Sequence, residues 1–163
     1  MNEPAPATRF FEHRSDFRCA VLDAIGLAES ELLMFDPTYL DWQANSPELA
    51  AALTAFLGRT TRAEIRMVIT EIDRIHRDYP RLAEVLRVHA HRIQCRVTPE
   101  TLADLNETML VIDRASALRR PVASVARGVL RVLDAEYAST QVDRFNELWE
   151  ACRDRYSPTT LGL

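Results

Sequence analysis

The chain of 163 residues contains no lysine, since all 20 of its basic residues are arginine. A P-loop needs a lysine on the nucleotide phosphates, a kinase needs a strand lysine for the same purpose, and a Schiff-base enzyme needs a primary amine. A chain without lysine therefore cannot be a P-loop nucleotide-binding protein, a protein kinase or a Schiff-base enzyme. A GC-rich genome also tends to produce arginine in place of lysine, so the absence excludes mechanisms without indicating one.

Glycine and cysteine are also scarce. The four glycines are scattered, so no glycine-rich phosphate loop can be written, and no serine has the flanking glycines of a nucleophile elbow. The three cysteines, Cys19, Cys95 and Cys152, lie far apart, which excludes a CxxC redox or zinc pair. We expect all three to be buried free thiols.

The histidines do not form a convincing metal or catalytic set. His89 and His91 form an HxH pair, but they end a predicted helix, where side chains two residues apart diverge. His76 lies in a segment of mixed charge that we expect to be a surface loop between a strand and a helix. We therefore expect neither a metal nor a cofactor.

Long apolar runs and basic clusters are missing as well. No run approaches the roughly 18 residues of a membrane span, and the first residues do not resemble a signal peptide, so a cytoplasmic protein without a membrane partner is expected. The net charge is −4 and no segment concentrates arginine, so a nucleic-acid partner is not expected.

The first half of the chain alternates helices and strands. We expect a flexible lead-in over residues 1–9 and a single domain over residues 10–163. The following elements are predicted: a helix capped near Ser15 and running to Ala28, a strand over residues 31–36, a helix from Ser46 to Gly58 and a strand over residues 65–69. The apolar run in the first strand predicts burial on both faces, and the two strands are expected to be parallel.

The second half continues the α/β pattern. We predict a helix from Pro80 to His89, a strand over residues 93–97, a buried strand over residues 109–112, two weaker antiparallel strands over residues 122–125 and 129–133, and a final helix capped by Thr140. The fold class is therefore α/β, with a mixed sheet flanked by helices.

Two aspartates directly follow buried strands. Asp36 follows the first and Asp113 the fourth, and open α/β sheets place ligand crevices at the carboxyl ends of strands. The two carboxylates could share a site there. Alternatively, each could accept hydrogen bonds from the backbone of its own turn.

The segment from Asn106 to Asp113 resembles the HxKxxxxD motif of the phospholipase D superfamily, with the hydrophobic strand and the final aspartate in register. Asn106 stands where the motif has its nucleophilic histidine, and Thr108 where it has the phosphate-binding lysine. Only Asp113 matches the motif. In the resembled motif, the aspartate at this position supports the histidine. The superfamily's downstream glycine-serine-asparagine step is missing.

The order of elements extends this resemblance. From about Arg14 to the C-terminus the chain is similar to a family of uncharacterised bacterial phospholipase-D-like domains, with one repeat where the superfamily usually has two. Some relatives in that family follow an N-acetyltransferase domain. The resemblance implies a phospholipase-D-like fold, and the two changed positions argue against its usual reaction.

Three functions remain open from the sequence. The leading hypothesis is a catalytically inactive binding or regulatory module, because asparagine cannot form the phosphoenzyme. The second is a phosphoesterase of altered, metal-assisted mechanism that uses Asp36 and Asp113, and the third is a structural subunit of a larger complex. The resemblance implies a homodimer, or another protein partner such as an acetyltransferase.

Overall fold

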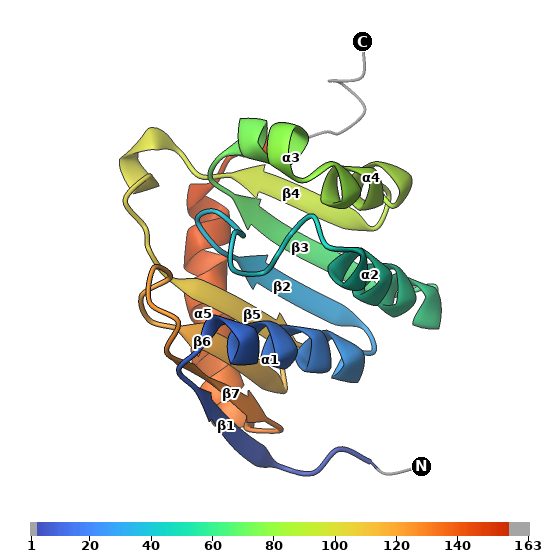
Figure 1. Ribbon diagram of the computed structural model, residues 1–163, viewed down its shortest axis with the longest axis vertical. Coiled ribbons are helices and arrows are strands. Elements are labelled where there is room, and N and C mark those ends of the chain that lie inside the picture. The colour runs from blue at the N-terminus through green and yellow to red at the C-terminus, as the bar shows by residue number, and fades with distance from the viewer. Residues whose placement is uncertain (1–2, 157–163) are drawn as a thin grey trace.

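The computed structural model describes residues 3–156, which form a mixed β-sheet with helices on both faces (Figure 1). The strands are β1 (Ala7–Phe11), β2 (Glu31–Phe35), β3 (Glu64–Ile69), β4 (Ile93–Val97), β5 (Thr108–Ile112), β6 (Ser116–Arg120), β7 (Gly128–Val132) and β8 (Asp154–Tyr156). The helices are α1 (Arg14–Leu27), α2 (Pro47–Arg59), α3 (Ile72–Asp78), α4 (Pro80–Val88) and α5 (Ala135–Ala151). The predicted α/β class is confirmed.

The strands follow the order β1-β7-β6-β5-β2-β3-β4-β8 across the sheet. β2, β3 and β4 are parallel, as predicted for the first two, because helices connect each strand to the next. β5 lies on the other side of β2 and runs antiparallel to it. This pairing brings the carboxyl end of β2 beside the start of β5, which determines the geometry of the candidate site.

The helices form two unequal layers. α1 to α4 cover one face of the sheet, and α5 alone crosses the other (Figure 1). Leu32 and Met34 of β2 belong to the core under α1 to α4, while Leu33 and Phe35 belong to the core under α5. The predicted burial of β2 on both faces is therefore confirmed, and each such side chain contributes about 1.5–3 kcal/mol of stability.

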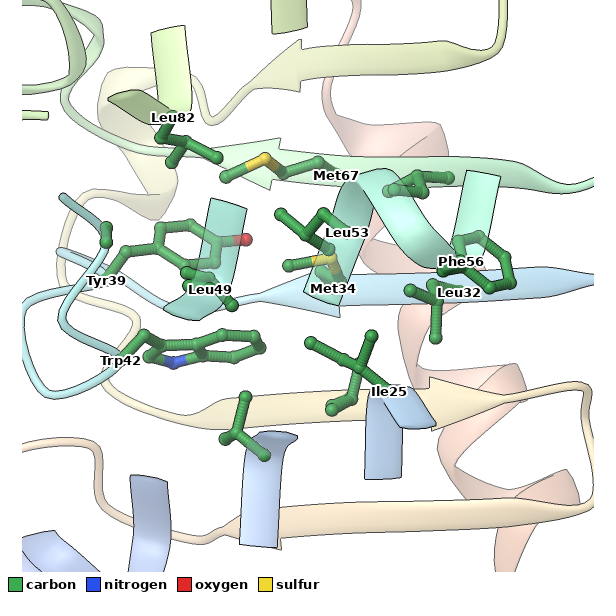
Figure 2. Close-up of a cluster of buried hydrophobic side chains, with 14 of the residues drawn as sticks. Ile25, Leu32, Met34, Tyr39, Trp42, Leu49, Leu53, Phe56, Met67 and Leu82 are labelled. Atoms are coloured by element: carbon green, nitrogen blue, oxygen red, sulfur yellow. The ribbon is translucent and has the colours of Figure 1, made fainter. Parts of the chain in front are cut away.

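The loop after β2 is fixed by aromatic packing. Tyr39 and Trp42 lie in the core beside Leu49 of α2, as Figure 2 shows. Their ring centroids are 5.1 Å apart, and the Tyr39 hydroxyl donates a hydrogen bond to the Val68 carbonyl at 2.9 Å. Because both rings are buried, the segment that begins at Asp36 has a defined conformation.

The predicted helix caps are correct for one helix and wrong for two. Ser46 caps α2 and accepts a hydrogen bond from the Leu49 N–H, although the helix continues through Gly58. Ser15 lies inside α1, whose N-cap is His13. Thr140 lies inside α5, whose N-cap is Asp134, because that carboxylate accepts a hydrogen bond from the Tyr137 N–H.

Three segments differ from the prediction. Residues 7–9, assigned to the lead-in, belong to β1, which pairs with β7. Residues 76–78, expected to be a loop, belong to α3. The strand expected over residues 122–125 is instead β6 (Ser116–Arg120), and the segment 122–125 forms part of the loop that follows it. β7 is part of an antiparallel pair, as predicted, but its partner is β6 and not the segment 122–125.

The three cysteines have different environments. Cys95 and Cys152 are buried, as expected, whereas Cys19 is exposed on α1. Burial raises the pKa of the Cys95 thiol to about 12. Cys95 is therefore protonated at neutral pH and unsuited to act as a nucleophile.

Within residues 3–156 no helix is both long enough and apolar enough to span a membrane.

Candidate functional site

Asp36 and Thr108 meet where β2 ends and β5 begins, because Phe35 pairs with Met109 in the sheet. One oxygen of the buried Asp36 carboxylate accepts hydrogen bonds from the Thr38 and Tyr39 N–H groups, at 3.0 and 2.8 Å. The other oxygen accepts from the Thr108 hydroxyl at 2.5 Å. Asp36 thus accepts hydrogen bonds from the backbone of its own turn, which is one of the two alternatives given for it above. It also accepts a hydrogen bond from Thr108 on the neighbouring strand β5.

Arg120, at the end of β6, completes this arrangement. Its side chain is 1% exposed, and its guanidinium donates hydrogen bonds to the Thr108 hydroxyl at 3.1 Å, to Asp36 at 3.1 Å and to Asp41 at 2.7 Å. The guanidinium carbon lies 3.9 Å from the centroid of the Phe17 ring. We call Asp36, Asp41, Thr108 and Arg120 the buried Arg120 cluster.

The two carboxylates of the buried Arg120 cluster are balanced by Arg120 together with Arg14, which lies outside the cluster. Two carboxylates surround one guanidinium, and Arg14 at the surface forms a second ion pair with Asp41 at 3.1 Å. The indole N–H of Trp42 also donates to Asp36, at 3.1 Å. Every polar side chain of the cluster therefore has partners within the protein, which is how buried charges are tolerated.

Asn106 lies at the surface beside the buried Arg120 cluster. Its side-chain amide donates a hydrogen bond to the Ser124 hydroxyl at 3.3 Å, and its backbone carbonyl accepts one from the Ala123 N–H at 2.9 Å. The next residue, Glu107, forms ion pairs with Arg119 and Arg144, at 3.0 and 2.6 Å. The arginines around this position are thus paired with carboxylates.

Asp113 lies at the opposite end of β5. Its carboxylate accepts hydrogen bonds from the backbone N–H groups of Glu29, Ser30 and Glu31, at 2.9, 2.8 and 2.9 Å. These are donors at the start of β2, and the Asp113 N–H returns a hydrogen bond to the Glu31 carbonyl at 3.0 Å. The positive φ of Asp113, 54°, places it in a tight turn before β6.

The shared site proposed for Asp36 and Asp113 does not exist. β2 and β5 are antiparallel, so the residue after β2 and the residue after β5 lie at opposite edges of the sheet. For the same reason Asp113 is remote from Asn106 and does not support the side chain at that position. The metal-assisted mechanism that uses Asp36 and Asp113 together is therefore wrong.

Three of the four histidines, His76, His89 and His91, lie elsewhere. His13 is the N-cap of α1, next to Arg14, whose guanidinium is paired with Asp41. His89 caps the end of α4, and His91 is in the exposed turn that follows. His76 lies on α3, with its Nε2 2.6 Å from the Tyr156 hydroxyl. Within residues 3–156 no three His, Cys, Asp or Glu side chains are grouped in a way that could hold a metal ion.

Two residues of the buried Arg120 cluster, Asp41 and Arg120, are not among the site residues predicted from the sequence. Asp41 and Arg120 are separated by 79 positions, and neither belongs to a recognisable motif. One signal was available: Arg120 directly precedes Pro121 at the end of a segment in which Ala117 and Leu118 are apolar. A strand with an arginine at its end could have been inferred there.

Solved structures with the same fold include phospholipase D family members. The chain is similar to Nuc from Salmonella typhimurium, with a TM-score of 0.67 and 17% sequence identity over 94% of this chain and 99% of that chain. It is also similar to the phosphatidylserine synthase of Haemophilus influenzae Rd KW20, with a TM-score of 0.63 and 11% identity over 97% of this chain and 41% of that chain.

A third similar structure is TrmBL2, an archaeal chromatin protein, with a TM-score of 0.63 and 12% identity over 89% of this chain. This chain spans about half of that protein, 53% of its length. At these identities the likeness shows the fold alone, which is phospholipase-D-like.

No curated protein matches the sequence. One family model matches residues 13–158, which is most of the chain, and its description is "Domain of unknown function (DUF7931)". The chain therefore belongs to the DUF7931 family.

Proposed function

We propose that this protein is a catalytically inactive phospholipase-D-like module that acts by binding a second copy of itself. The buried Arg120 cluster is the main support for the absence of catalysis. Thr108, at the position of the phosphate-binding lysine in the resembled motif, is buried and bonded to the Asp36 carboxylate. A phosphodiester approaching this position would be repelled by a carboxylate, and Arg120 is already neutralised.

The nucleophile position supports the same proposal. Asn106 carries an amide, which neither attacks phosphorus nor transfers a proton at neutral pH. The amide is bonded to Ser124, and Glu107 beside it pairs with two arginines. Asn106 therefore provides no nucleophile, and the two arginines next to it are paired with Glu107.

The surface proposed for self-association lies at the β1 edge of the sheet. Phe10 is 74% exposed, Val122 42% and Val125 50%. With Pro121 and Val129 they line an apolar hollow of about 310 Å³. We call these five residues the Phe10 patch. Exposed apolar groups that lie together in this way are typical of protein interaction sites.

A second copy is the partner that fits this edge. β1 is the outermost strand, so within residues 3–156 its outer backbone groups have no sheet partner. Antiparallel pairing of β1 with β1 of another copy would satisfy those groups in both chains and cover both Phe10 patches. Two-fold pairing is also the commonest assembly, and the resembled superfamily usually brings two repeats together.

Light scattering at micromolar concentration tests the self-association. We expect a mass of twice 18.6 kDa for the wild type. Phe10→Asp should reduce the mass to one chain, because it places a charge in the Phe10 patch. Leu40→Asp, at an apolar residue that is 59% exposed outside the patch, should leave the dimer intact. A wild-type mass of one chain, constant on concentration, would refute the homodimer and favour a different protein partner, such as an acetyltransferase.

A further inference from the structure

Three arginines gather on the α5 face of the sheet, at the edge opposite the Phe10 patch. Arg66 of β3 and Arg96 of β4 both lie over the indole ring of Trp149, with guanidinium carbons 5.8 and 4.3 Å from its centroid. Arg155 of β8 is the direct cross-strand partner of Arg96, so the two side chains project from the same face. The sheet therefore brings three positive charges together.

No carboxylate compensates these charges. Within residues 3–156 no Asp or Glu side chain forms an ion pair with Arg66, Arg96 or Arg155, although eleven other arginines of this region have such a partner. Like charges directly opposite each other on neighbouring strands are destabilising. An anion bound between them would remove this repulsion.

The guanidinium groups also have unused hydrogen-bonding capacity. The Nε atoms of Arg66 and Arg96 are buried and have no hydrogen-bond partner. One terminal nitrogen of Arg96 donates to the Trp149 carbonyl at 2.9 Å, which holds the side chain in place. Buried donors without partners are rare in folded proteins, because each one loses its hydration without compensation.

A cavity lies at the same place. It has a volume of about 140 Å³, and Gln94, Arg96, Trp149 and Arg155 are among its lining residues. Gln94 is exposed and is the cross-strand partner of Arg66, so its amide is available as a further donor. The cavity is therefore small and is lined by guanidinium and amide groups that can donate hydrogen bonds.

We propose that this cavity binds a phosphoryl group, either as free phosphate or at the end of a small metabolite. A phosphoryl dianion offers several acceptor oxygens to the forked donors of two lining arginines, and it compensates more of the three charges than a carboxylate does. The cavity lies at β4 and β8, apart from the start of β5 where Asn106 and Thr108 lie, so this inference is independent of the proposed function.

Calorimetric titration of the full chain tests the proposal with four probes: inorganic phosphate, adenosine 5′-monophosphate, adenosine and acetate. Phosphate and the nucleotide should bind saturably and compete, whereas adenosine and acetate should not bind. Tighter binding of the nucleotide would indicate a metabolite, and equal or weaker binding would indicate free phosphate. Both results support the phosphoryl site.

Arg155→Gln locates the site, since Arg155 is exposed and its replacement should not unfold the protein. It should weaken phosphate binding about tenfold through the loss of one charged donor. Arg87→Gln makes the same change of charge on α4 and should leave the affinity unaltered. The proposal is overturned if phosphate shows no saturable binding, if Arg155→Gln binds phosphate as tightly as wild type, or if adenosine binds as tightly as phosphate.

Discussion

At the scale of single residues, Thr108, which stands at the lysine position of the resembled motif, is part of the buried Arg120 cluster. Arg120 and Asp36 are 84 positions apart, and each is about 1% exposed. Asp36 and Thr108 could be marked from the sequence, because one ends an apolar strand and the other belongs to a motif. Asp41 could not, because an aspartate in an unassigned segment is usually at the surface. For Arg120 the available signal indicated a strand end but not that the arginine there is buried.

Arg120→Met tests the importance of this cluster. The substitution leaves the buried Asp36 carboxylate without its cation, while Asp41 keeps its surface ion pair with Arg14. It should therefore lower the free energy of unfolding by about 3–5 kcal/mol. Urea denaturation measures the loss. Arg87→Met, which removes an exposed ion pair with Glu84, should leave the midpoint close to that of the wild type. Equal midpoints for the two variants would contradict the assigned role of Arg120.

Asp113 provides a second prediction at this scale. Asp113→Ala removes the acceptor for three backbone N–H groups and places alanine at a positive φ, so it should cost about 1–3 kcal/mol of stability. Asp113→Asn should cost less, because asparagine tolerates positive φ and keeps one acceptor oxygen. A denaturation midpoint of Asp113→Ala identical to that of the wild type would show that these hydrogen bonds contribute nothing.

At the scale of secondary-structure elements, the sequence predicted those with strong local signals. β2, β3 and β5 are apolar runs, and α2 begins with a serine cap followed by proline. The missed elements have weak signals. α3 has seven residues with one of them buried, β1 buries only Phe11, and β6 begins with serine and ends with two arginines. Their conformations depend on neighbours that are distant in the sequence.

The start of α5 distinguishes the predicted cap from the observed one. Asp134→Ala should destabilise the protein by about 1 kcal/mol, because the Tyr137 N–H loses its acceptor at the helix N-terminus. Thr140→Ala should have little effect, since Thr140 is exposed inside the helix and alanine is the better helix former. Thermal unfolding compares the two variants, and a larger loss for Thr140→Ala would mean that α5 begins later.

At the scale of the whole molecule, the antiparallel pairing of β2 with β5 separates Asp36 from Asp113. The sequence indicates that an aspartate follows each strand, but strand direction depends on the complete topology. The fold class was predictable because the alternation of helices and strands along the chain is enough to indicate an α/β protein. The location of a site was not, since it required the strand order and the direction of each strand.

The absence of catalysis is the central claim, and the hydrolysis of bis-p-nitrophenyl phosphate tests it most directly. The assay is run with and without divalent metal ions, on the wild type and on Asn106→Ala, a substitution at an exposed residue. We predict that neither protein exceeds the rate without protein, because Asn106 stands at the nucleophile position and the arginines next to it are paired with Glu107. Saturable turnover by the wild type that Asn106→Ala abolishes would contradict the account.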